Sequence, residues 1–365
     1  MILIGLCTRP AKLVSQTRRL AQHIQRHSLS FEAKREGFTQ TRETKSHSPP
    51  LRLAHGALQQ RRKRMTTSIR SAADGEASSL WADVLKAYDH AEQVGASSKT
   101  DTMTELVTDE STRVQFVVRV ASKLKDKPKG PPKRAGKPKE WRNPFLPYEE
   151  DLFVRQLCSG EHVLLLNKFN VVPHHLLVVT ADFQEQTDPL NAGDFECVWE
   201  VLAGMPGMGG LAFFNCGDAS GHSQPHKHVQ VVPLPLDEDQ EKPSPFHDLI
   251  MAGPPGVPFK MPGIEFEHSC IQLPEQGVTG EFLQDAYSTL MPGVTNVSDS
   301  YNMVMTRDWM MLVPRRQERS SSGVVAVNAL GFAGTLLVRS SDEVTEVREQ
   351  GPMAILKEVG VPLAK

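Results

Sequence analysis

The stretch Asn215–Pro233, NCGDASGHSQPHKHVQVVP, constrains the fold of this chain more than any other segment. Polar and apolar residues alternate along its second half, and this pattern predicts a strand with one buried face. Because alternate side chains of a strand share a face, one face is expected to carry His226, His228 and Gln230. The opposite face is expected to carry Lys227, Val229 and Val231. The strand therefore directs two imidazoles and an amide toward one place.

The first half of the stretch, Asp218–Gln224, is rich in serine and glycine. Such a composition lets backbone N–H groups approach and surround an anion. A potential nucleophile, a phosphate-binding loop and a polar side chain thus follow one another closely in the sequence. This combination predicts phosphoryl or nucleotidyl transfer.

An imidazole that attacks phosphorus needs one neutral nitrogen facing the substrate and a partner for the other nitrogen. We assign the nucleophile to His228, with its second nitrogen held by a backbone carbonyl in Asn215–Gly221. Gln230 is expected to hold a non-bridging phosphoryl oxygen, and His226 to support the site or donate to a phosphate. The further donors to the same phosphate are expected to be Gly221, Ser223 and Gln224.

Two other interpretations of the histidine pair compete with catalysis. Histidines at alternating strand positions are also half of a zinc site, or simply structural. No carboxylate or cysteine at an obvious spacing completes a metal-binding set, so we expect no protein-bound metal. The adjoining Ser/Gly loop favours phosphate chemistry.

Charged residues are distributed unevenly along the chain. Residues 1–70 carry 15 Lys/Arg and 3 Asp/Glu, whereas the whole chain has a net charge of −2. The Arg- and Ser-rich composition is typical of an organelle transit peptide. A disordered tail, or translated sequence ahead of a start at Met65, would explain it equally. We expect residues 1–75 to form a basic leader outside the folded core, and the protein to be cytoplasmic or, if the leader is a transit peptide, chloroplast or mitochondrial.

Hydrophobic periodicity predicts an α+β fold with an antiparallel or mixed sheet that is covered on one face. The expected helices lie at 79–94, within 183–203, at 281–290 and at 354–359, and the expected strands at 114–120, 162–166, 176–180, 211–215, 228–233, 301–306 and 309–314, with 330–338 a strand or the start of a buried helix. The proline-rich Pro233–Phe246 predicts a boundary or long loop. We therefore expect two sheet-containing lobes, 76–240 and 241–365.

The segment Lys123–Glu140 contains seven lysines and one arginine among prolines and glycines. A solvated linker explains most of these lysines, but one of them could reach a polyphosphate. The five cysteines are scattered, without a CxxC pair, which argues against a disulfide framework and favours a reducing compartment. No apolar run is long enough for a membrane span.

Four blocks of sequence together resemble the ATP adenylyltransferases, or diadenosine tetraphosphate phosphorylases, of the histidine-triad and galactose-1-phosphate uridylyltransferase superfamily. The blocks are VLLLNKFNVVPHHLLVVT (Val163–Thr180), FFNCGDASGHSQPHKHVQVVPLP (Phe213–Pro235), SYNMVMTRDWMMLVPR (Ser300–Arg315) and VNALGFAGTLLV (Val327–Val338). The resemblance extends from about residue 114 to the C-terminus, and it implies a histidine-triad-like fold with flanking helices.

The resemblance implies a reversible phosphorolysis of diadenosine tetraphosphate to ATP and ADP through an adenylyl-histidine intermediate. The second histidine of the HxHxQ motif, His228, is the implied nucleophile. Small histidine-triad hydrolases carry a third histidine where this chain has Gln230, so transfer to phosphate is favoured over hydrolysis. His222 stands where the family has a small residue, usually serine. The other implied substrate-binding residues are Lys127, Asn167, Lys168, Asn215, Gly221–Gln224, Tyr301, Asn302 and Arg307.

The expected partners are adenosine polyphosphates and inorganic phosphate, or sulfate in a related exchange, and neither nucleic acid nor a membrane. A divalent cation, Mg²⁺, is expected to offset the polyphosphate charge. The sequence does not fix the oligomeric state, although it favours a monomer. Two alternatives remain: a hexose-1-phosphate nucleotidyltransferase, which uses the same motif, and a nucleotide-binding sensor that has lost catalysis.

Overall fold

The computed structural model describes residues 79–99, 102–121, 142–238 and 241–363. The described residues from Leu80 onward belong to one compact unit. The predictions for the basic leader and for the lysine-rich segment Lys123–Glu140, which includes Lys127, concern residues outside these ranges.

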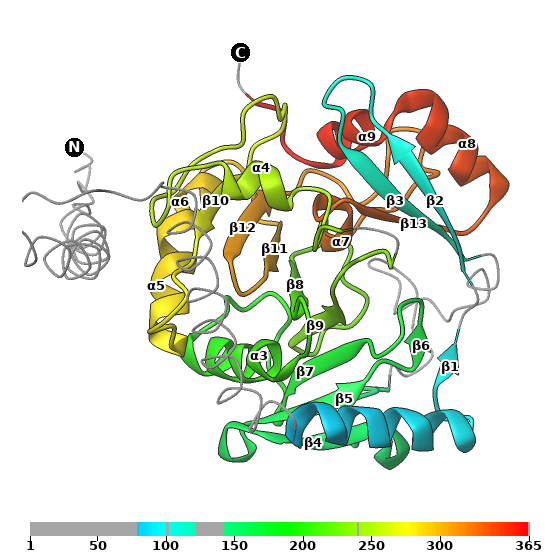
Figure 1. Ribbon diagram of the computed structural model, residues 1–365, viewed down its shortest axis with the longest axis vertical. Helices are drawn as coiled ribbons and strands as arrows, with labels where there is room; N and C mark the ends of the chain where they lie inside the picture. Colours follow the sequence, from blue (N-terminus) through cyan, green and yellow to red (C-terminus); the bar gives the residue numbers. More distant parts are fainter. Residues whose placement is uncertain (1–78, 100–101, 122–141, 239–240, 364–365) are drawn as a thin grey trace, which may run out of the picture. The chain divides into compact units, whose positions relative to one another are not determined.

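An eight-stranded sheet forms the centre of the described unit (Figure 1). Every neighbouring pair in it is antiparallel, as expected. From one edge to the other, its strands are β10 (Ser269–Gln272), β12 (Trp309–Pro314), β11 (Tyr301–Met305), β8 (Gly210–Cys216), β9 (His228–Pro233), β7 (Leu176–Thr180), β5 (His162–Leu166) and β4 (Phe153–Leu157).

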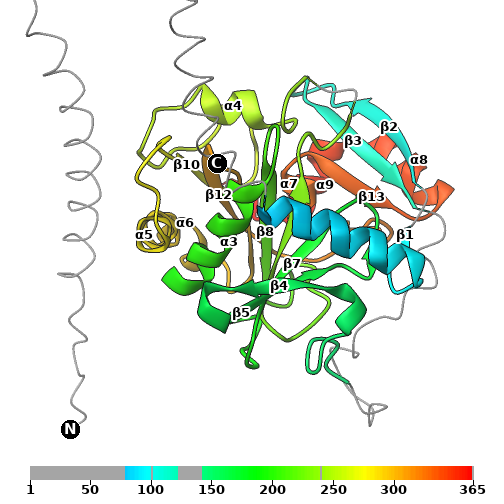
Figure 2. The same ribbon diagram turned by 60° about the horizontal axis from the view of Figure 1, so that its bottom comes forward.

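Both faces of this sheet are covered, so the expectation of a one-sided sheet was wrong. Helices α3 (Ala192–Gly204) and α5 (Gly280–Leu290) contact one face, whereas α7 (Ala329–Phe332) contacts β8 and β11 on the other (Figure 2). Double coverage explains the uniformly apolar central strands, because each of their faces must enter a core. In β8, β11 and β12 every residue is buried.

A second, three-stranded sheet joins the two ends of the described unit. Its order is β13–β3–β2, with β13 (Thr335–Val338) parallel to β3 (Gln115–Val120) and β2 (Met103–Thr108) antiparallel to β3. A hydrophobic cluster links this sheet with the large one through Phe116, Phe213, Phe332 and Leu336. The early and late parts of the chain therefore share one core.

The remaining elements complete the unit. They are a helix at 79–93, β1 (Ser98–Lys99) parallel to β6 (Phe169–Asn170), α4 (His247–Met251), α6 (Pro292–Thr295), α8 (Ser341–Gln350), α9 (Pro352–Val359) and the 3-10 turns η2 (Glu150–Leu152) and η3 (Cys158–Gly160). No helix in the described ranges is both long and apolar enough to cross a membrane.

Most predicted elements occur where their periodicity placed them. The segment 330–338, which fitted either a strand or a helix start, contains the end of α7 and then β13. The expected boundary near residue 240 falls between β9 and α4. However, the large sheet is continuous across this boundary, since β10, β11 and β12 pair with the strands that precede it.

One disulfide differs from the expectation for the cysteines. Cys158 in η3 and Cys197 in α3 are bonded, with their Cα atoms 5.8 Å apart although 39 residues separate them in sequence. Cys216 and Cys270 are free and buried. The pairing could not be read from spacing, because only the docking of α3 beside η3 brings the two cysteines together.

Candidate active site

Strand β9 carries the predicted nucleophile between two other strands. His228 pairs with Val179 of β7, and Gln230 pairs with Leu177 of β7 and Phe213 of β8. His228 is 5% exposed and Gln230 is half-buried. His226 lies just before the strand, in an isolated bridge with Glu185. The central position in the sheet holds His228 on a rigid element.

A backbone carbonyl fixes the tautomer of His228. The Nδ1 atom lies 2.8 Å from the carbonyl oxygen of His226. A carbonyl oxygen can only accept, so Nδ1 carries the proton and Nε2 carries the lone pair of the neutral ring. The expected kind of partner is present, but it is His226 itself rather than a residue of Asn215–Gly221. Nε2 can therefore act as a nucleophile.

His226 supports the site through both of its ring nitrogens. Nε2 donates to the Thr180 carbonyl oxygen at 2.9 Å, and Nδ1 accepts from the side-chain amide of Asn143 at 3.0 Å. The residue is fully buried, and burial lowers its pKa, so the ring stays neutral at pH 7. The ring of Phe145 lies 5.6 Å from that of His226 and 5.4 Å from that of His228. The structure thus favours the supporting role for His226 over phosphate donation.

Gln186, which the sequence analysis missed, holds the backbone of His228. Its Oε1 accepts from the His228 N–H at 2.8 Å. Its Nε2 donates to the carbonyl oxygens of His228, at 3.2 Å, and Asn215, at 2.9 Å. The side chain is 1% exposed and bridges β8 and β9 beyond their last paired residues. A lone glutamine in a loop gives no sequence signal of such a role.

The Ser/Gly loop between β8 and β9 is a compact turn. Gly217 and Gly221 have φ of 83° and 84°, a region that disfavours other residues. A Cβ on Gly221 would also lie 2.9 Å from the Val327 carbonyl oxygen. The Ser220 hydroxyl and the His222 ring donate to the Gly217 carbonyl oxygen, at 2.6 and 3.0 Å. The histidine at position 222 is therefore used to close the turn.

The remaining predicted phosphate donors follow this turn directly. Ser223 is exposed, whereas Gln224 is half-buried. Both precede Pro225, whose carbonyl accepts from the backbone N–H of Gln186 at 2.7 Å. The loop that carries them is thus tied to the residue that holds His228.

Asn215 and Asn302 form a buried support rather than an open binding surface. They face each other on β8 and β11, and the Asn302 amide donates to the Asn215 side-chain oxygen at 2.8 Å and to the Ser220 carbonyl at 3.0 Å. The Asn302 oxygen accepts from Arg315 at 2.6 Å. Asn302 is fully buried and satisfied by protein groups, so the structure gives it another role than the substrate contact that we expected.

Arg315 links this support to the C-terminal segment. Its guanidinium donates to the carbonyl oxygens of Ser220, Gln317, Val327 and Val359, at 2.8–3.2 Å. It is 1% exposed, and burial lowers its pKa to about 9. Since every one of these partners is uncharged, the arginine fixes backbone geometry behind the loop.

The other predicted ligands are spread over the sheet. Asn167 bonds the ring of His175 at 3.0 Å, and Lys168 pairs with Glu149 at 2.7 Å on the surface. The buried Tyr301 hydroxyl bonds that of Tyr287, and burial raises its pKa. Arg307 follows the far end of β11 and donates to the Gly207 carbonyl at 3.3 Å. The structure thus does not bring Tyr301 and Arg307 to His228.

The opposite face of the catalytic strand contains a buried ion pair. Lys227 and Asp194 are 2% and 3% exposed, and their charged atoms lie 2.8 Å apart. Asp194 also accepts from His162 at 2.8 Å and from the backbone N–H of Asn191 at 2.9 Å, as part of the capping box of α3. Burial by itself would raise the pKa of Asp194, but these hydrogen bonds offset it and hold the pKa low. Lys227 thereby anchors the strand to α3.

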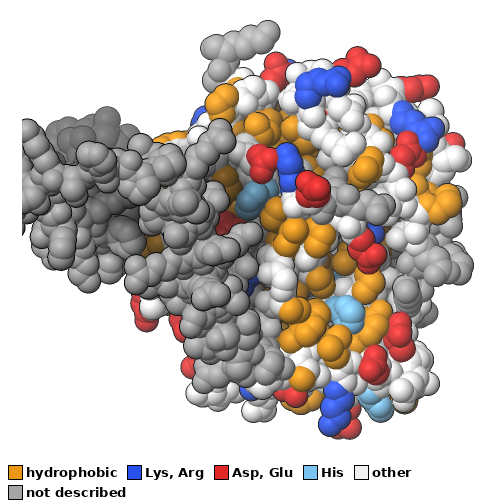
Figure 3. Space-filling model, in the orientation of Figure 1, with side chains coloured by type: hydrophobic (Ala, Val, Ile, Leu, Met, Phe, Trp, Pro, Cys, Tyr) orange, Lys and Arg blue, Asp and Glu red, His pale blue; other side chains and the backbone are white. Residues whose placement is uncertain are grey.

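The arrangement provides the parts for transfer of a phosphoryl or nucleotidyl group. A tautomerically fixed imidazole lies beside a glycine-rich turn, with Gln230 on the same strand face. Figure 3 shows one face of the molecule, on which apolar and histidine side chains gather in the middle with charged groups around them. Within the described residues, no group of three His, Cys, Asp or Glu side chains is arranged to hold a metal ion.

Family models and related proteins all identify the same family for this chain. The Ap4A phosphorylase N-terminal domain matches residues 70–252, and the ATP adenylyltransferase C-terminal domain matches residues 262–362. Diadenosine 5',5'''-P1,P4-tetraphosphate phosphorylase 2 of Saccharomyces cerevisiae is 31% identical over 272 residues, which cover 66% of this chain and 81% of the yeast protein.

Solved structures agree with this result. The crystal structure of yeast Ap4A phosphorylase Apa2 in complex with Ap4A has a TM-score of 0.69 and 29% identity, and the match covers 78% of this chain and 98% of that one. The complex of the same yeast enzyme with AMP has a TM-score of 0.68 and 29% identity over 78% and 96% of the two chains. The chain belongs to the Ap4A phosphorylase family.

Proposed function

We propose that this protein catalyses the reversible phosphorolysis of diadenosine tetraphosphate to ATP and ADP. The observation that carries the proposal is the hydrogen bond from Nδ1 of His228 to the His226 carbonyl, at 2.8 Å, which leaves the lone pair on Nε2. The yeast relatives in the comparison are diadenosine tetraphosphate phosphorylases, and one was crystallised with Ap4A.

The reaction has two steps. Nε2 of His228 attacks the α-phosphorus, the bond from this phosphorus to the bridging oxygen breaks, and ATP leaves. The imidazole then carries the adenylyl group and a positive charge. In the second step, an oxygen of inorganic phosphate attacks the same phosphorus, the P–N bond breaks, and ADP forms while His228 returns to its neutral state. Dividing one displacement into two is the general advantage of a covalent intermediate.

The neighbouring residues act by positioning and by stabilising charge. Gln230 and the backbone of the Gly221–Gln224 loop provide donors for the phosphoryl oxygens, on which negative charge builds up in the transition state. Gln186 keeps the His228 backbone in register, and His226 fixes the carbonyl that orients the nucleophile. Asn167, Lys168 and Lys127 remain candidates for nucleotide contacts.

Mg²⁺ would enter with the substrate. A polyphosphate binds Mg²⁺ through its own oxygens, and the ion usually keeps several water ligands. Side-chain clusters of three metal ligands do not occur in the described part of the chain, which suits an ion carried mainly by the nucleotide. Bound to the polyphosphate, the ion would neutralise part of its charge.

We also propose a separate role for each of three segments of the chain. Residues 76–240 supply the nucleophile and the phosphate loop, whereas residues 241–365 close the site from the opposite side. Residues 1–75 act as a leader, which would direct the protein to an organelle; N-terminal sequencing of the native protein tests this directly.

The decisive experiment measures how cleavage of diadenosine tetraphosphate depends on phosphate. We expect equal amounts of ATP and ADP by chromatography, formed only when phosphate is present. Mass spectrometry after quenching without phosphate should detect one added AMP on His228. Formation of ATP plus AMP without phosphate would make the protein a hydrolase and would refute the proposal.

A further inference from the structure

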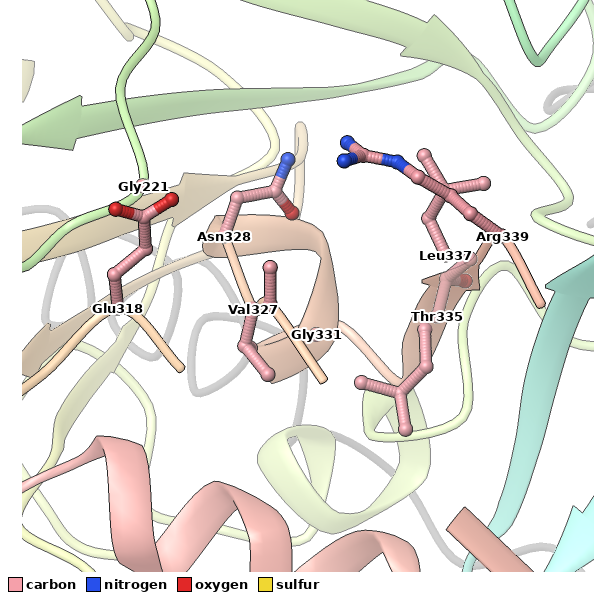
Figure 4. A pocket seen from close by; sticks show the side chains of 10 residues that line it. Gly221, Glu318, Val327, Asn328, Gly331, Thr335, Leu337 and Arg339 are labelled. Carbon is pink, nitrogen blue, oxygen red and sulfur yellow. The ribbon is translucent and has the colours of Figure 1, made fainter. Parts of the chain in front are cut away.

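Two distant parts of the chain border the elements that carry the candidate site. From the C-terminal part, residues of the segment 318–339 line a small pocket of about 90 Å³ together with Gly221 of the Ser/Gly loop (Figure 4). From the part before β4, the turn at 143–148 contacts the histidine pair, since the Phe145 ring lies against both imidazoles. This turn also contains Asn143, whose side chain reaches one of the two histidines.

The side-chain amide of Asn143 has a fixed orientation. Its Oδ1 lies 3.0 Å from the backbone nitrogen of Phe145, and a backbone N–H can only donate, so Oδ1 is the acceptor. The NH₂ group therefore makes the other contact, with Nδ1 of His226 at 3.0 Å. Because an NH₂ group only donates, Nδ1 of His226 carries no proton.

Both ring nitrogens of His226 are thereby assigned. Its Nε2 lies 2.9 Å from the carbonyl oxygen of Thr180, which can only accept, so Nε2 carries the proton. A second proton would have to enter at Nδ1, where the Asn143 amide already directs an N–H. The two contacts together select one neutral tautomer and oppose the imidazolium.

The charged residues near His226 point away from it or are exposed. Lys227 pairs with Asp194 on the opposite face of the strand, at 2.8 Å. Asp182 and Glu185, in the loop that forms an isolated bridge with His226, are exposed. Burial lowers the pKa of the His226 ring. Burial and the amide thus act together to keep the ring uncharged.

A neutral His226 matters because the next residue on the same strand face becomes charged. Alternate residues of a strand stand about 7 Å apart. In the proposed reaction, attack by Nε2 of His228 leaves a positive charge on that imidazole, and a like charge nearby would disfavour it. His226 also supplies the carbonyl oxygen that orients the His228 ring, at 2.8 Å. The charge and the position of His226 therefore both bear on the nucleophile.

We propose that Asn143 is a positioning residue for the transfer reaction, an inference that rests on the proposed phosphorolysis. Its amide keeps a proton off Nδ1 of His226. His228 then forms its adenylyl-imidazolium beside an uncharged ring, whose carbonyl oxygen stays in place.

The test reverses this hydrogen bond with almost no change in shape. In Asn143→Asp the carboxylate still accepts from the Phe145 N–H, but it also accepts from Nδ1 of His226, which must then carry a proton. Asn143→Ser keeps the turn, because a serine hydroxyl accepts from an N–H two residues later, but its shorter side chain loses the contact with His226. We expect kcat for phosphorolysis to fall about tenfold in the first variant and about threefold in the second.

Nitrogen chemical shifts of labelled histidine rings provide a second readout. At pH 7 the unaltered protein and Asn143→Ser should show His226 protonated at Nε2 alone. Asn143→Asp should show a proton at Nδ1 as well. A His226→Asn protein identifies the signals by their loss. Repulsion between the new carboxylate and the polyphosphate appears in KM, whereas kcat is measured at saturating substrate.

Asn191→Asp is the matched control. The Asn191 side-chain oxygen only accepts, from the backbone N–H of Asp194 at 3.1 Å, and a carboxylate makes the same bond. Neither kcat nor the His226 signals should change in this variant. Thermal melting checks that all the variants are folded.

The order of the two Asn143 variants decides the outcome. A merely structural role would make the isosteric Asn143→Asp milder than Asn143→Ser, and this order would overturn the inference. An unprotonated Nδ1 in the folded aspartate variant would overturn it too. So would an unchanged kcat in Asn143→Ser, whether or not the aspartate variant folds. If the unaltered protein lacks phosphorolysis, the proposed function fails, whereas the ring signals still test the contact with His226.

Discussion

The two faces of strand β9 are built on opposite principles. On one face, neutral groups hold His228: a carbonyl orients its ring, and the Gln186 amide holds its backbone. On the other face, the next residue back, Lys227, forms a buried ion pair with Asp194 at 2.8 Å. The comparison suggests that the ion pair fixes the strand, while the hydrogen bonds on the other side orient the imidazole and its backbone.

A second histidine shows that local geometry alone does not make a nucleophile. His268 repeats the arrangement of His228, since its Nδ1 lies 2.8 Å from the carbonyl oxygen of Phe266, two residues earlier. Its Nε2, however, accepts from the backbone N–H of Met261 at 2.7 Å. The lone pair of His268 is thus occupied by a backbone hydrogen bond, and burial lowers the pKa of its ring.

The largest expected effect is the difference in activity between substitutions of His228 and of His268. His228→Gly should reduce phosphorolysis by at least about a thousandfold, since the nucleophile is lost and little can replace it. It should still bind nucleotide and form no AMP adduct. His268→Gln, the control, should lower the melting temperature but retain kcat. Full activity of the folded His228→Gly protein would show that another residue attacks.

The ion pair on the back face should matter for stability rather than chemistry. Lys227→Met leaves the Asp194 carboxylate buried without its cation, which typically costs about 3–5 kcal/mol. Lys357→Met, which removes an exposed ion pair with Glu265 at 2.6 Å, should cost under about 1 kcal/mol. Urea unfolding measures both. Similar losses in the two variants would mean that burial does not make the Lys227–Asp194 ion pair more important than an exposed one.

Gln186 should affect turnover more than substrate binding. Gln186→Met removes the contacts with the His228 backbone without touching substrate, so kcat should fall about tenfold while KM changes little. Gln272 offers a matched control. It is a second buried glutamine, whose Nε2 donates to the carbonyls of Ile250, Met251 and Gly253, at 2.8–3.1 Å.

Gln272→Met should therefore lose stability with an unchanged kcat. If both glutamine variants lose stability alike and neither changes kcat, the bridging amide of Gln186 is only structural.

The smallest expected effect is on the pH dependence of unfolding. The pKa of Asp194 is lowered in the folded state, so its contribution to stability is present above the unfolded pKa of about 4. This contribution is lost as the pH falls through the lower, folded pKa. The difference in the free energy of unfolding between the unaltered protein and Asp194→Asn should therefore be largest at pH 7 and shrink in the acid range. A constant difference at all pH values would exclude this origin.

Local patterns were sufficient for much of the fold. Strands β5 and β7 begin and end where their apolar runs do, and α5 differs from its expected range by one residue. Alternation in β9 placed Lys227 on the face opposite His228, as expected. The sequence had no comparable signal for the second layer over the sheet, because an apolar strand looks the same whether one or both of its faces are covered.

Such local patterns predicted only part of the candidate site. Asn302 and Asn215 were expected to be ligands because of the family resemblance, not because of a local pattern. The structure uses them instead to join β11, β8 and the loop that contains Ser220. A buried polar group must be satisfied, but the sequence does not tell whether protein or substrate satisfies it.

The sequence by itself determined the family, the strand that carries the HxHxQ motif and the alternation of its two faces. These properties depend on residues close together in the chain, whose spacing fixes their geometry. Only the tertiary structure decided that Gln186 holds the nucleophile, that Cys158 meets Cys197, and that the C-terminal segment forms a pocket beside Gly221. Such contacts join distant residues through the docking of whole elements, which no local spacing encodes.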